Sequence, residues 1–208
     1  CNSVRELDTM IDKIIATETV QPGQTWRKRG IFCADDAWSN GYGAEALSTL
    51  IYRSNEEDFA ETVRDSLAMW WETGTEAGLT SRVLLLDTYL APYGDGGPRP
   101  VEDFRYYTET EATPVLLSEL NQGGLVAHYQ GHANPYVLAS EYWFMDRPIT
   151  TDRSDVASLT NTGRTWFFSG LGCHVSDWAQ NTVRTGSVPN EQSLGEKLLV
   201  KTSAGAFA

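Results

Sequence analysis

Two stretches decide the fold of this chain: Gly124–His132, with the sequence GLVAHYQGH, and Thr165–His174, with the sequence TWFFSGLGCH. Each is a short apolar run that closes on a glycine and then presents a reactive side chain, His132 in the first and Cys173 in the second. Apolar runs of this length are typical of strands that are buried on both faces of a sheet. We therefore expect neighbouring strands that carry a histidine and a cysteine at their ends.

Helical patterns separate the apolar runs. The first covers Ser3–Glu18, where apolar residues recur at helical spacing and Ser3 and Glu6 form a capping box. Further helices are expected over residues 44–53 and 56–72, from Thr113-Pro114 to about residue 120, after a cap at Ser154-Asp155, and over residues 193–202 from a second capping box. A last strand is expected over residues 204–208. The pattern predicts one α/β domain with a mostly parallel central sheet and helices on both faces.

Polar candidates follow four of the predicted strands. Asp35 and Asp36 end the run that begins at Gly30, and Asp87 ends the run that begins at Arg82. His132 and Cys173 end the other two runs. The carboxyl ends of parallel strands meet at one edge of the sheet, which is where ligands bind in open α/β folds. The sequence therefore predicts that these side chains share one edge.

A cysteine next to a histidine is the pair that thiol-dependent acyl transfer requires. The imidazole activates the thiol and then protonates the leaving amine, while backbone N–H groups stabilise the oxyanion. Glycines precede both residues, Gly131 before His132 and Gly172 before Cys173, and they allow a close approach of backbone and substrate. By spacing alone, a buried structural cysteine with an unrelated histidine fits the pattern too.

The chain resembles the catalytic domain of the gingipain family of cysteine peptidases, which have a caspase-like fold. The stretches that carry the resemblance occur in family order: Leu7–Ile15, Ile31–Asp36, Glu119–His132, Leu159–Cys173 and Gly195–Ala208. The resemblance implies a three-layer sandwich and a bacterial protein that is secreted or on the cell surface. It also implies that residues 1–208 are a catalytic domain incomplete at both ends, within a longer polypeptide.

The same resemblance assigns roles to residues. Cys173 is expected to be the nucleophile, His132 the general acid and base, and the N–H groups of Ala133 and Cys173 the oxyanion donors. Asp35, Asp36 and Asp87 are candidates for a third, orienting carboxylate by strand position only. The sequence departs from the family at two points, because Ala133 stands where glycine usually follows the histidine and Gly172 where caspase-like peptidases often have alanine.

Composition limits the partners. The formal net charge of −12 argues against nucleic acid and anionic membranes, which require basic surfaces. No apolar run approaches the roughly 20 residues of a membrane span. The three cysteines, Cys1, Cys33 and Cys173, are too few for a disulfide scaffold. We expect a protein or peptide substrate, and neither a cofactor nor a metal.

Other functions have weaker support in the sequence. His128 and His132 lie four residues apart, a spacing that can hold zinc, but no third ligand is evident. Aspartate-ended strands also occur in Mg²⁺-dependent phosphotransferases, and aromatic runs such as Tyr142–Phe144 occur in carbohydrate-binding modules. A transpeptidase would use the same Cys–His pair. The alternative from a different class is an inactive peptidase-like domain that serves binding or assembly.

Overall fold

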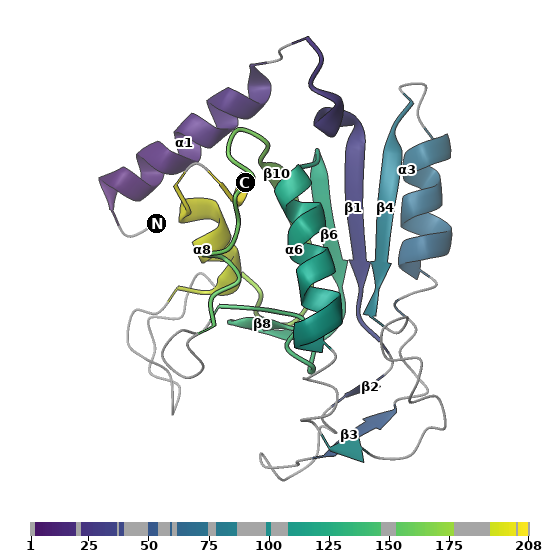
Figure 1. Cartoon of the computed structure of the whole chain (residues 1–208). Helices are drawn as coiled ribbons and strands as arrows, with labels where there is room; N and C mark the ends of the chain where they lie inside the picture. Colours follow the sequence, from purple (N-terminus) through teal and green to yellow (C-terminus); the bar gives the residue numbers. More distant parts are fainter. Residues whose placement is uncertain are drawn as a thin grey trace.

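The centre of the molecule is a five-stranded sheet in the order β11-β10-β6-β1-β4, in which every neighbouring pair is parallel (Figure 1). The computed structural model describes residues 3–19, 22–36, 38–39, 50–53, 59, 62–74, 78–86, 99–100, 108–146, 153–176, 192–202 and 204–207. The strands of the sheet are β1 (Arg29–Ala34), β4 (Thr80–Leu85), β6 (Val126–Gln130), β10 (Trp166–Leu171) and β11 (Ala206–Phe207). The predicted parallel α/β sheet is confirmed.

Helices cover both faces of this sheet. They are α1 (Val4–Glu18), η1 (Thr25–Lys28), η2 (Thr62–Ala68), α3 (Met69–Thr73), η4 (Thr108–Ala112), α6 (Thr113–Gln122) and α8 (Leu194–Val200). Ile31 of β1 joins a core with α6 and α8, whereas its neighbour Phe32 joins a second core with Val63 of η2. Because successive residues of a strand point to opposite faces, these two cores lie on opposite sides of the sheet. The three-layer arrangement is confirmed.

Two small antiparallel sheets lie beyond the carboxyl ends of the central strands (Figure 1). One contains β2 (Trp38–Ser39), β3 (Leu50–Arg53) and β5 (Arg99–Pro100). The other contains β7 (Ala133–Asn134), β8 (Val137–Leu138) and β9 (Phe144–Met145). The second sheet follows His132 directly, so it sets the environment of that residue.

Three helix predictions are wrong in part. Residues 50–53 of the predicted helix over 44–53 form β3, because Leu50, Ile51 and Tyr52 suit an extended chain paired with its neighbours; residues 44–49 lie outside the described residues. The helix around Thr113 begins earlier, since the chain is already helical from Thr108. Residues 155–158 form turns rather than a helix, with the N–H of Ala157 donating to Ser154 Oγ (3.1 Å).

Hydrogen bonds expected of both predicted capping boxes are present. Ser3 Oγ accepts the N–H of Glu6 at 3.2 Å, and the Ser193–Glu196 box is complete. The apolar stripe of α1 is wider than the surface that it buries, because Met10 packs against the core while Leu7 and Ile11 are 46% and 43% exposed. Among the described residues, no helix combines the length and apolar character of a membrane span.

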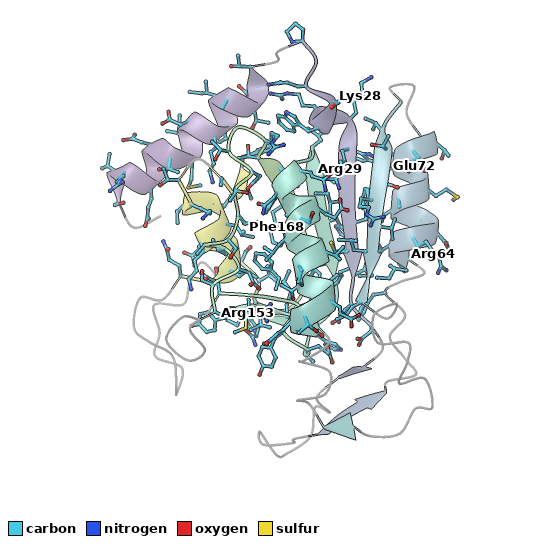
Figure 2. The ribbon with its side chains drawn as sticks, viewed as in Figure 1. Lys28, Arg29, Arg64, Glu72, Arg153 and Phe168 are labelled. Atoms are coloured by element: carbon cyan, nitrogen blue, oxygen red, sulfur yellow. The ribbon has the colours of Figure 1, made fainter. Side chains whose placement is uncertain are left out.

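An ion-pair cluster fixes α6 to the amino-terminal end of the sheet. Arg29, labelled at the start of β1 in Figure 2, pairs with Glu119 of α6, and it donates to the carbonyl oxygens of Glu119 and Gly123 at 2.9 Å each. Arg82 of β4 pairs with the same carboxylate at 3.0 Å. Glu119 therefore bridges two strands, and α6 is held in a fixed position across the sheet.

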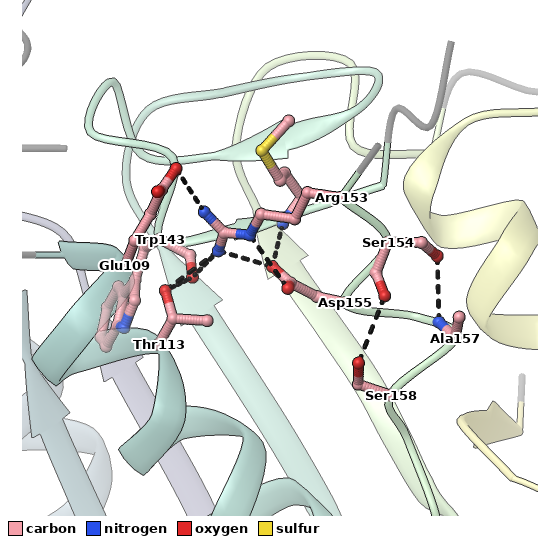
Figure 3. Close-up of polar contacts among 9 residues, drawn as sticks. Glu109, Thr113, Trp143, Arg153, Ser154, Asp155, Ala157 and Ser158 are labelled. Atoms are coloured by element: carbon pink, nitrogen blue, oxygen red, sulfur yellow. Dashed lines mark hydrogen bonds and ion pairs between the residues drawn. The ribbon is translucent and has the colours of Figure 1, made fainter. Parts of the chain in front are cut away.

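A second cluster, around Arg153, holds the other end of α6 (Figure 3). The guanidinium of Arg153 pairs with Asp155 at 2.7 Å and Glu109 at 3.1 Å, and it donates to Thr113 Oγ1 at 3.0 Å. Thr113 Oγ1 in turn donates to the carbonyl oxygen of Trp143 at 2.6 Å. The hydroxyl predicted to cap the helix thus anchors the loop that precedes β9.

Candidate active site

The structure brings the two glycine-framed strand ends together. β6 and β10 are neighbours in register, and the N–H of Gly131 donates to the carbonyl oxygen of Leu171 at 3.1 Å. A Cβ added to Gly172 would lie 2.8 Å from the Cβ of Ala133 and 3.0 Å from the carbonyl oxygen of Gly131. The backbone before Cys173 therefore abuts the backbone on either side of His132, at the carboxyl edge of the sheet.

Gly131 is required by both its conformation and its surroundings. Its φ is 155°, and a Cβ there would lie 2.1 Å from the Cβ of Asp35. Real side chains do not approach so closely, so any other residue would displace Asp35 or the strand end. The absence of a side chain lets β6 end directly against β1 and places His132 next to Asp35.

Asp35 holds the turn that carries His132. Its Oδ2 accepts the backbone N–H of His132 at 2.8 Å and the hydroxyl of Tyr129 at 3.3 Å, while Oδ1 accepts the N–H of Asp36 at 3.0 Å. The Tyr129 hydroxyl also accepts the N–H of Ala139 at 2.9 Å. Burial raises the pKa of Asp35, and the N–H groups of His132 and Asp36 oppose that rise. One buried carboxyl group thus fixes the backbone around the candidate base.

The hairpin formed by β7 and β8 leaves the N–H of Ala133 outside its hydrogen-bond ladder. The N–H of Ala139 donates to the carbonyl oxygen of His132 at 2.8 Å, and Ala133 pairs with Leu138 one step further along. Hydrogen-bonded and non-hydrogen-bonded pairs alternate in an antiparallel ladder, so Ala133 occupies a non-hydrogen-bonded position. Its N–H therefore points away from β8.

A cavity of about 220 Å³ opens beside this hairpin. His132, Ala133 and Asn134 line one part of it, and Ser140 and Tyr142 line another. The ring of His132 is half-buried and meets Phe59 edge to face, with ring centroids 5.9 Å apart. Cys173 is exposed in the turn after β10. A substrate segment can thus reach both side chains from solvent.

His128 lies apart from this arrangement. It is buried, its Nδ1 is 3.1 Å from Ser169 Oγ on β10, and burial lowers its pKa. His132 follows the strand and stands beside Asp35 instead. Among the described residues, neither histidine belongs to a group of three side chains that could hold a metal. The zinc alternative at His128 and His132 gains no support from the geometry.

The other cysteine and aspartate candidates differ from Cys173 and Asp35 in burial or lie outside the described residues. Cys33 is buried in the core, and burial raises the pKa of its thiol to about 12. Asp36 is buried beside Asp35 at the end of β1. Asp87 and Cys1 lie outside the described residues. Of the thiols that the structure describes, only Cys173 reaches the surface.

Sequence reasoning missed Tyr129 and Glu141. Tyr129 looked like one more apolar strand residue, yet its hydroxyl contacts Asp35 and the turn at His132. Glu141 is fully buried, and one of its carboxylate oxygens lies within 4.8 Å of a carboxylate oxygen of Asp35 and of Asp36. A lone carboxylate between Ala139 and the aromatic residues Tyr142 and Trp143 is the signal that marks it, because buried charges occur where something balances them.

Comparison with known proteins decides the family. The model of peptidase family C25 matches residues 1–208, the whole chain. The chain belongs to peptidase family C25. No curated protein sequence gives a significant match.

Solved structures share this fold at low sequence identity. The Arg-specific cysteine proteinase gingipain R superposes with a TM-score of 0.62 at 16% identity, over 99% of this chain and 37% of that one. A complex of the pro- and mature domains of RgpB from Porphyromonas gingivalis gives 0.62 at 16% over 100% and 37%. A third structure, described only as a protease, gives 0.53 at 20% over 99% and 33%. The chain thus has the fold of these structures and spans about a third of their length.

Proposed function

We propose that this C25 protein is a cysteine endopeptidase in which Cys173 is the nucleophile and His132 the general acid and base. Family membership supports the reaction class. The observation that carries the assignment of residues is the contact of Gly172 with Gly131 and Ala133, which joins the two strand ends. Cys173 is exposed and next to this contact, whereas Cys33 is buried.

In the proposed reaction, Cys173 Sγ attacks the carbonyl carbon of the scissile peptide bond and the thiol proton passes to His132. The N–H groups of Ala133 and Cys173 stabilise the oxyanion of the tetrahedral intermediate. His132 then protonates the amine as the C–N bond breaks, which leaves a thioester on Cys173. Water, deprotonated by His132, attacks the thioester and releases the carboxylate product and the free thiol.

Asp35 takes a positioning role in this proposal rather than the role of a third catalytic residue. It contacts the backbone N–H of His132. Asp36 is buried on the same strand end, and Asp87 remains a candidate by strand position only. The substrate is a protein or peptide, and the domain is one part of a larger secreted or surface-exposed bacterial polypeptide. This chain covers 37% of the gingipain chain, and that supports a larger polypeptide.

The test compares matched variants of the full-length protein on a peptide library. Cys173→Ala and His132→Ala are expected to abolish cleavage, whereas Cys33→Ala and His128→Ala are expected to retain it. These controls remove the same residue types from the core and from β6. Mass spectrometry of the protein with a slowly turned-over ester should detect an acyl group on Cys173.

Three results would redirect the proposal. Cleavage that persists in Cys173→Ala would place the nucleophile elsewhere. No cleavage and no acylation of the wild-type protein would favour the inactive, peptidase-like binding domain, with Ala133 as the departure from the family pattern. An added amine that appears joined to the acyl product would identify a transpeptidase, because it captures the same thioester.

A further inference from the structure

The cavity of about 220 Å³ beside the hairpin of β7 and β8 lies on the His132 side of the candidate active site. His132 and Ala133 line it, whereas Cys173 is not among the described residues that do so. Cys173 extends instead from the turn after β10, a different strand from the one that His132 follows. The cavity therefore contacts the candidate base rather than the candidate nucleophile.

The far wall of the cavity is the connection between β8 and β9, residues 139–142, which we call the 139–142 loop. Ala139, Ser140 and Tyr142 of this loop line the cavity. Ala139 and Tyr142 have φ of 66° and 62°, a left-handed conformation that is uncommon for residues with a side chain. Backbone in such conformations persists where surrounding contacts hold it, and it is concentrated at ligand-binding sites.

Hydrogen bonds fix the 139–142 loop to the turn that carries His132. The N–H of Ala139 donates to the carbonyl oxygen of His132 at 2.8 Å and to the hydroxyl of Tyr129 at 2.9 Å. The N–H of Trp143 donates to the carbonyl oxygen of Leu138 at 3.0 Å and closes the loop. Both walls of the cavity are thus joined before any ligand arrives, which is how small binding sites are usually built.

The proposed reaction divides the substrate into two halves, and the cavity can be assigned to one of them. The acyl half is bonded to Cys173 in the thioester, and the amine half departs after it takes a proton from His132. The amine half therefore passes over the imidazole. A cavity lined by His132 and not by Cys173 is placed to receive the side chain of the first residue after the scissile bond, P1′.

The residues that line the cavity indicate which P1′ side chains it accepts. Asn134, Ser140 and Tyr142 carry an amide and two hydroxyl groups, while Val137 and Ala139 add apolar surface. None of the described lining residues carries a carboxylate, an ammonium or a guanidinium group. A charged P1′ side chain would lose part of its water there without gaining an ion pair, whereas a neutral polar one can form hydrogen bonds.

We propose that this cavity is the P1′ subsite, and that it selects neutral side chains able to form hydrogen bonds over charged ones. The inference rests on the proposed function, because only cleavage of a peptide bond defines a P1′ residue. It adds a specificity determinant on the amine side of that bond. Ser140 and Tyr142 of the 139–142 loop are the residues that determine it.

The test uses substrates of the full-length protein that share one acyl half, taken from a peptide that the protein cleaves. In one series P1′ is varied, and a further substrate is the methyl ester of the same acyl half, whose leaving group is too small to fill the cavity. For the wild type, kcat/KM with Asn, Gln, Ser or Thr at P1′ is expected to exceed that with Asp, Glu, Lys or Arg by roughly 10-fold.

Ser140→Leu should reduce the space of the subsite. The ratio of kcat/KM for the peptide with Asn at P1′ to kcat/KM for the methyl ester is expected to fall about 10-fold relative to the wild type. Ser158→Leu is the matched control, since Ser158 lies in an exposed turn that Asn121 contacts at the other end of α6. Its ratio should equal that of the wild type.

A ratio that stays at the wild-type value in Ser140→Leu, with both substrates slowed equally, would place the cavity on the acyl half and overturn the proposal. Hydrolysis of peptide and ester without any P1′ preference would overturn it too, and would leave the proposed function intact. A wild type that hydrolyses neither substrate would remove the proposed function and this inference with it. Should Ser140→Leu fail to fold, Ser140→Ala carries the comparison, with the preference for Ser over Ala at P1′ expected to fall roughly 3- to 10-fold.

Discussion

The backbone N–H of His132 donates to Oδ2 of Asp35 at 2.8 Å, so the candidate base is held by the strand next to its own. An orienting carboxylate in a catalytic triad contacts the imidazole ring. Here the contact is to the main chain, and Tyr129 adds a second bond between the same carboxylate and the same turn. Asp35 therefore fixes the backbone from which the His132 ring extends.

Replacement of Asp35 should reduce turnover more than substrate binding. We expect Asp35→Ala to lower kcat about 100-fold, since a misplacement of about 1 Å can cost that much. Asp35→Asn should be impaired too, because both oxygens of Asp35 accept backbone N–H groups and an amide offers only one acceptor oxygen. Steady-state kinetics on a cleaved peptide, with KM near the wild-type value, would check this.

Asp155→Ala is the control for a general loss of stability. Asp155 is also buried and also accepts a backbone N–H, from Met145 at 2.8 Å, but it belongs to the Arg153 cluster. Its removal should lower the melting temperature and leave kcat unchanged at lower temperature. If the loss of kcat in both aspartate variants follows the decrease in their melting temperatures, Asp35 has no special effect on His132.

The contact between Gly172 and Ala133 predicts a compensating pair of substitutions. Gly172→Ala alone should lower kcat/KM by about 10- to 100-fold, because its Cβ would stand 2.8 Å from that of Ala133 and push the Cys173 turn away. Gly172→Ala combined with Ala133→Gly removes that clash. The double variant should regain much of the lost kcat/KM. The recovery should be incomplete, because the new Cβ at position 172 would still lie 3.0 Å from the carbonyl oxygen of Gly131.

Kinetics of the four proteins in this cycle give the coupling between the two positions. Ala133→Gly alone should change kcat/KM little. Additive effects of the two substitutions would show that the clash does not displace the Cys173 turn. Ala133 stands where the gingipain family usually has glycine, and Gly172 stands where caspase-like peptidases often have alanine, so a positive coupling would also explain why both departures occur together.

The sequence predicted the parts of the fold that short-range periodicity controls. The runs that became β1, β6 and β10 are mostly apolar, as expected for strands covered on both faces, and the glycine before His132 and before Cys173 marked the edge. The helix caps at Ser3 and Ser193 likewise depend only on residues close in sequence. The position of His132 and Cys173 at one edge follows from parallel pairing alone.

The remaining features depend on tertiary contacts that no local pattern records. β3 was predicted as helix because a short apolar run such as Leu50–Tyr52 fits either structure. Thr113 has the sequence of a cap, but its hydroxyl bonds to Trp143, 30 residues away. Asp35 and Asp36 lie close to Glu141, although more than 100 positions separate them in the sequence. Pairing of this kind is visible only once the sheet order is known.

The two thiols described in the structure should differ sharply in reactivity. Iodoacetamide is expected to label Cys173 in the native protein and to leave Cys33 unmodified, because Cys173 is exposed while burial raises the pKa of Cys33 to about 12. Peptide mapping by mass spectrometry after a short exposure gives both extents. Labelling of both thiols in denaturant is the control, and early modification of Cys33 in native protein would contradict its place in the core.

Lys13 should make the free energy of unfolding depend on pH in the alkaline range. Its Nζ donates to the carbonyl oxygens of Leu198 and Ala204, at 3.2 and 3.3 Å, and this ties α1 to the end of α8. Burial, with the charge of Lys201, lowers the pKa of Lys13 from its ordinary value of 10.5 to about 8. Between these two values the unfolded chain binds the proton that the folded protein has lost. The folded state therefore gains stability as pH rises from about 8 to 10.5, by at most about 1.4 kcal/mol per pH unit.

Denaturant unfolding of the wild type and of Lys13→Met across pH 7–11 measures this contribution as a difference of slopes. The free energy of unfolding of the wild type should rise relative to that of Lys13→Met between about pH 8 and 10.5, and the difference should be constant below pH 7. Lys28→Met, which removes an exposed lysine, should run parallel to the wild type throughout. Parallel curves for Lys13→Met as well would mean that Lys13 keeps its proton in the folded protein, held by the two carbonyl oxygens that it contacts.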